Sequence, residues 1–176
     1  MITPDYVATM AAYNRWQNVS LFGAGNGLSD EERKRDRGAF FGSIQRTLSH
    51  LAWGDTIWLS RFGVGAPPEV GIDESPDWIA EWNDLAEQRA ALDAAIDLWA
   101  SSVSEQDLGQ DLSFYSGSLG RDVTSPMTTC VAHFFNHQTH HRGQAHGLLT
   151  AAGAKPGPTD LFVMPANYTD RVKKGE

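Results

Sequence analysis

Residues 41–62 read FGSIQRTLSHLAWGDTIWLSRF, and this stretch carries the clearest structural signal in the chain. Its apolar side chains recur alternately three and four residues apart, which is the spacing of a helix face packed against other helices. The positions on this face are Phe41, Ile44, Leu48, Leu51, Asp55, Trp58 and Phe62. The pattern predicts a helix over about 39–63 whose apolar face lies inside a helical bundle.

Three more long segments have helical patterns and recognisable start signals. Thr3 and Pro4 are typical of a helix start, and they predict a helix over about 4–22 that ends at a run of glycines. Ser-Pro pairs precede the other two segments, which we expect to form helices over about 76–102 and 126–152. A short charged helix follows the first, starting at a capping box. The chain is therefore predicted to be all-α, a four-helix bundle.

The faces of the second and third long helices are each interrupted by one charged residue. Asp55 interrupts the first of these faces, and Arg89 interrupts the other. A buried charge is tolerated when it is paired, so one hypothesis is that these two residues form an ion pair inside the bundle. The alternative is that one or both lie at a helix flank and reach water.

The segment before the last helix does not have a helical pattern. Residues 112–125, LSFYSGSLGRDVTS, combine aromatic and β-branched residues with Gly-Ser punctuation, which favours a small β-hairpin.

Composition excludes several classes of protein. Lys and Arg number 14 against 22 Asp and Glu, and the net charge of −8 argues against a nucleic-acid partner. Eleven of the acids and two of the bases lie in 61–110, which indicates a solvated helix surface. The single cysteine cannot form an internal disulfide. No apolar run approaches the ~18 residues of a membrane span, and no targeting pattern is visible, so we expect a cytoplasmic protein without a membrane partner.

Five of the six histidines lie in one segment of the last predicted helix, HFFNHQTHHRGQAH. His137 and His141 fall near the centre of its apolar face, whereas His133 and His140 fall at the edge and His146 nearly opposite, in solvent. Imidazoles four residues apart project to one side of a helix and can supply two metal ligands. The same spacing also occurs in helices that hold no metal, and no Glu follows the first His as it does in zincin proteases.

His50 lies in another predicted buried helix and can complete a set of three ligands. It is roughly 125° around that helix from the apolar face, on a side that it shares with Trp53 and Ile57. The helix is therefore apolar on two sides, and the second side faces either a neighbouring element or a second subunit. The pattern does not say which side holds a site.

Three stretches resemble the DinB-like (YfiT-like) metalloenzyme family. They are YNRWQN at 13–18, TLSHLAWGDTIWLSRF at 47–62 and AHFFNHQTHHRGQAHGLL at 132–149. The resemblance covers nearly the whole chain, and it implies a single domain over 1–176, up-down-down-up topology and a homodimer. It also implies one divalent ion per chain, zinc or nickel, held by His50, His137 and His141.

Three neutral histidines leave a divalent ion with open positions, as in catalytic rather than structural sites. The family that the chain resembles includes thiol-dependent S-transferases and isomerases. By this resemblance we expect a reaction in which the metal activates a small-molecule thiol that attacks an electrophile. Two alternatives stay open. One is a metal-dependent hydrolase with metal-bound water as the nucleophile, and the other is a non-catalytic protein that binds a metal or a small ligand.

Three further residues bear on the predicted site. Cys130 lies on the same helix stripe as His137 and can line the cavity, or it can be a small buried hydrophobe. Arg142 and Gln144 can shape the pocket or support the helix, with solvation at the helix surface as the alternative for Arg142.

Overall fold

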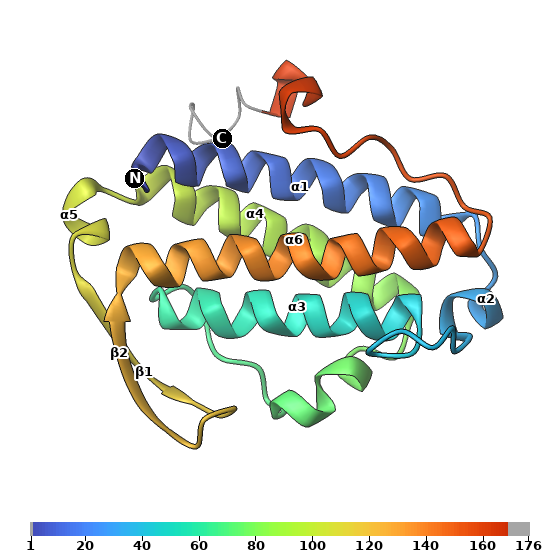
Figure 1. The fold of residues 1–176 in the computed structure, drawn as a ribbon, viewed down its shortest axis with the longest axis horizontal. Helices are drawn as coiled ribbons and strands as arrows, with labels where there is room; N and C mark the ends of the chain where they lie inside the picture. The colour runs from blue at the N-terminus through green and yellow to red at the C-terminus, as the bar shows by residue number, and fades with distance from the viewer. Residues whose placement is uncertain (1, 169–176) are drawn as a thin grey trace.

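The computed structural model describes residues 2–168, and four long helices form the predicted bundle (Figure 1). They are α1 (Pro4–Asn26), α3 (Ile44–Arg61), α4 (Trp82–Ser102) and α6 (Met127–Ala151). In Figure 1, α1 and α6 run in one direction and α3 and α4 in the other, so the topology is up-down-down-up. The closest pairings are α3 with α6 and α1 with α4.

Short elements connect these helices. They are α2 (Asp30–Lys34), η1 (Ile72–Asp77), α5 (Glu105–Leu108) and η2 (Leu161–Val163). Strands β1 (Asp111–Ser116) and β2 (Arg121–Pro126) form the predicted antiparallel hairpin directly before α6, with Phe114 opposite Val123. Within residues 2–168, no helix combines the length and apolar character needed to cross a membrane.

Three helix boundaries differ from the prediction, each for a local reason. α1 continues through its glycines to Asn26, and Gly25 admits Trp82, because a Cβ at Gly25 would lie 2.6 Å from the indole Cη2. α3 begins at Ile44, where Ser43 caps it by accepting a hydrogen bond from a backbone N–H. α4 begins only at Trp82, because the predicted Ser-Pro start belongs to η1.

The two charged residues that interrupt the helix faces meet in the core, as hypothesised. Arg89 Nη1 lies 2.5 Å from Asp55 Oδ2, and their side chains are 4% and 0% exposed. Asp93 lies 3.0 Å from the same guanidinium, and Gln138 donates a 2.9 Å hydrogen bond to Asp55. The ion pair therefore joins α3, α4 and α6 at the level of the histidines.

α1 joins the same polar network from the opposite corner of the bundle. Asn14 and Asn18 both donate to the Oδ1 of Asp93, and buried Arg142 donates to the Oδ1 of Asn14. The alternative that Arg142 is solvated at the helix surface is therefore wrong, because α1 offers it a buried acceptor. All four long helices share this network, which sets how α3 and α6 face each other.

Candidate metal centre

The three predicted ligands meet between α3 and α6. His50 comes from α3 and His137 and His141 from α6, and each offers a ring nitrogen that lies within 4.8 Å of the other two. His50 and His141 are buried, and His137 is half-buried. The buried network sets how α3 and α6 are oriented towards each other, and the two helices thereby bring three imidazoles together.

His50 is buried because a segment distant in sequence covers the second apolar side of α3. Ser49 donates to the carbonyl of Ser75 and accepts from the backbone N–H of Ile79, which holds η1 against α3. Trp53 donates to the Val70 carbonyl at 2.9 Å. The second side therefore faces a neighbouring element, and it gives no support to the predicted homodimer, which stays a prediction.

The hydrogen bonds of Ser75 determine which ring nitrogen of His50 carries the proton. The Ser75 hydroxyl donates to the Ile72 carbonyl at 2.6 Å, so its oxygen is left to accept. His50 Nδ1 lies 2.7 Å from that oxygen and must be the donor. Nε2 of His50 consequently carries the free lone pair that a metal ligand needs.

Gln144 imposes the same tautomer on His141. Its side-chain oxygen lies 2.8 Å from His141 Nδ1 and can only accept, so Nδ1 carries the proton and Nε2 the lone pair. The amide nitrogen of Gln144 faces His140 Nε2 at 3.1 Å, which supports this orientation of the amide. His140 is exposed and lies outside the cluster of three.

His137 completes the cluster, and its ring lies against Gly54 of α3. A Cβ at Gly54 would lie 2.6 Å from His137 Cε1, so the imidazole occupies space that any other residue at this position would fill. Within residues 2–168, the buried Nδ1 of His137 has no hydrogen-bond partner. A buried nitrogen without a partner is costly in a purely structural histidine.

Burial keeps the cluster neutral. Desolvation, and then the neighbouring His141, lowers the pKa of His50 from 6.5 to about 4. Desolvation and the other histidines lower the pKa of His137 to about 3. At neutral pH both rings therefore hold unprotonated nitrogens, which is the state that binds a metal.

These observations fit a divalent ion. In His50 and His141, Nδ1–H is held by Ser75 and Gln144, which leaves the Nε2 lone pairs free. In His137, the buried Nδ1 has no hydrogen-bond partner among the described residues. Hydrogen bonds from the outer ring nitrogen are the usual support of metal-binding histidines. Imidazole suits zinc and nickel among other metals.

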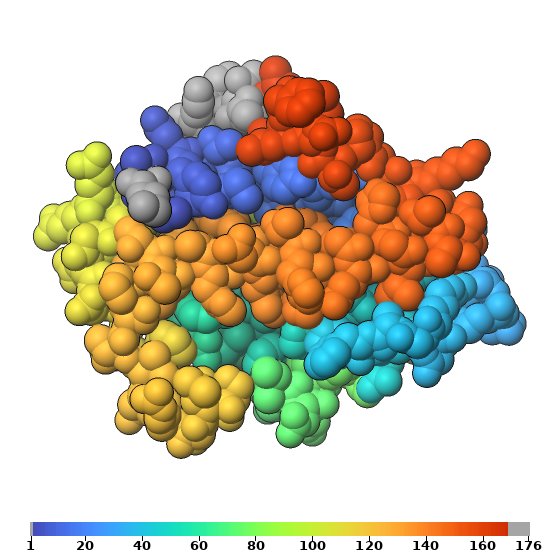
Figure 2. Space-filling view, in the orientation of Figure 1, coloured from blue at the N-terminus to red at the C-terminus, as the bar shows by residue number. Residues whose placement is uncertain are grey.

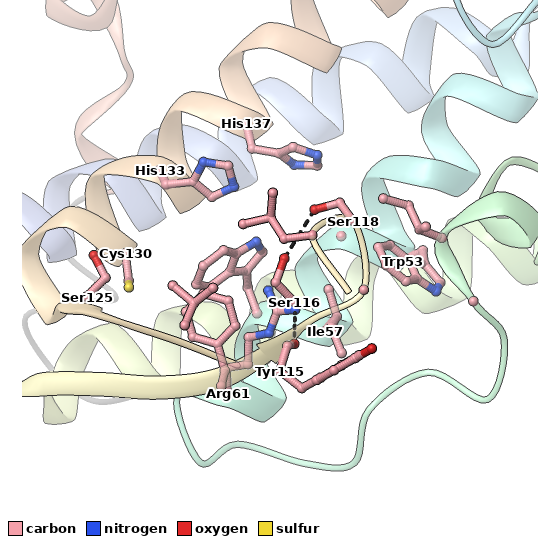
Figure 3. A pocket seen from close by; sticks show the side chains of 18 of the residues that line it. Trp53, Ile57, Arg61, Tyr115, Ser116, Ser118, Ser125, Cys130, His133 and His137 are labelled. Atoms are coloured by element: carbon pink, nitrogen blue, oxygen red, sulfur yellow. Dashed lines mark hydrogen bonds between the residues drawn. The ribbon is translucent and has the colours of Figure 1, made fainter. Parts of the chain in front are cut away.

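A cavity of about 620 Å³ opens beside the cluster, and His50 and His137 line part of it. It lies between α3 and α6 under the β1–β2 hairpin, where Figure 2 shows α3 largely covered by the surrounding segments. Figure 3 shows His133, His137 and Cys130 reaching from α6 into this space, with Arg61 and Tyr115 on its other side.

Cys130 is both a buried residue and a wall of the cavity, so the two expectations for it describe the same position. Burial raises the pKa of its thiol, and the lowering contributions of Ser125 and Arg61 are smaller. The thiol is therefore protonated at neutral pH and is a poor nucleophile.

Comparison with known proteins agrees with this fold. The model of the DinB family matches residues 1–171. The chain belongs to the DinB family. Protein DinB of Bacillus subtilis (strain 168) is 25% identical over 158 residues, which is 89% of this chain and 91% of that protein. The crystal structure of a DinB-like protein from Bacillus cereus ATCC 10987 covers 81% of this chain and 90% of its own, with a TM-score of 0.60 and 21% identity, and it shows the same fold.

Sequence reasoning missed three residues of this DinB family site. Ser75 was interpreted as a helix start, and nothing in its local sequence indicates that it orients His50. Gly54 is an isolated glycine inside a helical pattern, and such a glycine can indicate that another group packs closely against the helix backbone. Arg61 also lines the cavity, which the hairpin helps to form.

Proposed function

We propose that this DinB family protein is a metal-dependent transferase that joins a small-molecule thiol to an apolar electrophile. The observation that supports the proposal is the neutral three-histidine cluster at one end of a largely apolar cavity. A divalent ion bound there, zinc or nickel, would supply the positive charge that favours the thiolate form of a bound thiol.

His50, His137 and His141 would hold the ion, and none of them brings a negative charge. The ion's full charge is then available to stabilise an anionic sulfur. Ser75 and Gln144 keep the Nε2 atoms of His50 and His141 free, so these residues orient the ligands.

The proposed reaction balances without a redox partner. The thiol sulfur forms a bond to the electrophilic carbon as the bond from that carbon to its leaving group breaks. The thiol proton and the leaving group depart to solvent as an acid, or, with an epoxide, the proton is taken up by the opened oxygen. The nucleophile comes from outside the chain, because the thiol of Cys130 is held protonated.

The residues around the cavity bear on the choice between the transferase and the hydrolase. No Asp or Glu of the described residues lines the cavity, so the hydrolase alternative would depend on metal-bound water alone. The walls are mainly aromatic and aliphatic, which suits an apolar electrophile.

The test is product analysis with defined reagents. Zinc- or nickel-loaded protein is incubated with cysteine and 1-chloro-2,4-dinitrobenzene, and the thioether is measured by mass spectrometry. We expect metal-dependent thioether formation that His137→Ala abolishes and His140→Ala retains. Cleavage of simple esters without a thiol requirement would instead establish the hydrolase, and absence of both reactions over a panel of thiols and electrophiles would leave a binding protein.

A further inference from the structure

The cavity beside the histidine cluster contains one permanently charged side chain among the described residues, Arg61 at the end of α3. The rest of the wall consists of aromatic, aliphatic, hydroxyl and glycine positions together with Cys130 and histidines. Charged side chains that are partly removed from water are usually paired with an opposite charge. This chain has a net charge of −8, so acidic partners are abundant, yet none lines the cavity beside Arg61 among the described residues.

Arg61 is held in place by groups that do not neutralise it. Its guanidinium carbon lies 4.6 Å from the ring centre of Trp58 and 4.3 Å from that of Phe114. One N–H donates to the Tyr115 carbonyl at 3.2 Å. The ion pairs found among residues 2–168 do not include Arg61, so its remaining donors lack a carboxylate partner.

Arg61 and His50 of the histidine cluster lie on one face of the same helix, α3. His50, Gly54, Ile57 and Arg61 follow each other at intervals of four, three and four residues, and all of them line the cavity. At about 1.5 Å per residue, the Cα atoms of His50 and Arg61 are about 16 Å apart along α3. The cavity therefore extends along α3, with His50 and Arg61 both in its wall.

We propose that the cavity binds a substrate with an apolar body and one carboxylate, and that Arg61 recognises the carboxylate while the reacting end faces the histidines. The orientation of the substrate, with its reacting end at the histidines, rests on the proposed function. The binding of its carboxylate by Arg61 does not. Guanidinium presents paired N–H donors that match a carboxylate, and such charge-assisted hydrogen bonds are stronger than those between neutral groups. A neutral amide of the same shape would lack this charge.

A matched pair of probes tests the proposal. Binding of 2-naphthaleneacetate and of its neutral amide is measured by calorimetry on the protein as purified and again after metal removal. We expect the carboxylate to bind at least about tenfold more tightly than the amide in both forms. In Arg61→Gln the preference should vanish while the amide affinity stays within about twofold. Arg121→Gln, which removes an exposed arginine of the hairpin, should retain the preference.

A second measurement needs no variant and covers the case in which Arg61→Gln does not fold. Phenylglyoxal modification of wild-type Arg61 is followed by peptide mass spectrometry, with exposed Arg46 as the internal control. We expect 2-naphthaleneacetate, and not the amide, to slow modification of Arg61 alone.

Equal binding of the two probes would overturn the inference, as would failure of the carboxylate to protect Arg61. A preference that survives in Arg61→Gln but disappears with the metal would place the anion on the ion instead. Absence of thiol transfer together with an Arg61-dependent preference would refute the proposed function and leave the carboxylate subsite standing.

Discussion

Gly54 of α3 and His137 of α6 touch so closely that a Cβ at position 54 would lie 2.6 Å from the imidazole Cε1. Helix α3 therefore has no side chain where the His137 ring lies. The glycine is a steric requirement of the site, since its helix would be more stable with alanine at an open position.

Replacing this glycine should damage the cluster more than the fold. In Gly54→Ala we expect the His137 ring to be displaced and zinc affinity, measured by calorimetry, to fall by a factor of ten or more. Gly147→Ala is the matched control, because a Cβ there meets nothing within 4 Å, and it should leave zinc affinity unchanged. Unaltered zinc binding in Gly54→Ala would show that the close contact does not position His137.

Ser75 should act on the metal through His50. Ser75→Ala removes the acceptor 2.7 Å from His50 Nδ1, which frees the ring to rotate and to change tautomer. Loss of such outer partners typically costs about 10–100-fold in metal affinity, and we expect a change in that range in zinc titrations. Ser101→Ala, at an exposed position of α4, provides the control. Equal affinities in the two variants would contradict the assigned tautomer.

The buried ion pair should show a large cost when one partner is removed. We expect Arg89→Met to lower the free energy of unfolding by about 3–5 kcal/mol in urea titrations, because it leaves the buried Asp55 carboxylate without its cation. Asp55→Asn should cost less, because Arg89 keeps its ion pair with Asp93. Arg46→Gln breaks an exposed ion pair with Asp77 and should cost about 1 kcal/mol or less. Single variants as stable as wild type would mean that the core pair carries no such penalty.

The metal-free protein should become less stable in mild acid. An unfolded histidine takes up a proton near pH 6.5, whereas the pKa values of His50 and His137 in the folded protein are about 4 and about 3. The unfolded state therefore binds more protons below pH 6.5, and stability should fall as the pH drops from 7 towards 4. In thermal unfolding, His137→Asn should flatten this dependence, while His146→Asn should not. A melting temperature that rises over this interval would contradict the low pKa values.

Local patterns were enough to predict the four helices and the hairpin, because a bundle helix repeats its apolar residues at the helical period. They also placed His137 and His141 on one side of α6. The burial of His50 could not be read in the same way, since it depends on η1 and on hydrogen bonds from Ser49 to a segment 26 residues away. Contacts between distant segments, such as that between Gly54 and His137, likewise leave only weak local signals.

The start of α4 shows how a local signal can mislead. Ser75 followed by proline is typical of a helix start, yet it forms part of η1, which covers His50. The segment's role is set by its hydrogen bonds across α3 and not by its own sequence.

The central claim is that His50, His137 and His141 hold one divalent ion. Elemental analysis of the protein purified without chelators measures this directly, with each histidine replaced in turn by alanine. The expected result is close to one zinc or nickel ion per chain in wild type and in His140→Ala, with loss of the ion in His50→Ala, His137→Ala and His141→Ala. A folded wild-type protein that takes up no divalent ion from zinc- or nickel-containing buffer, or that retains its ion when all three histidines are replaced, would contradict the claim.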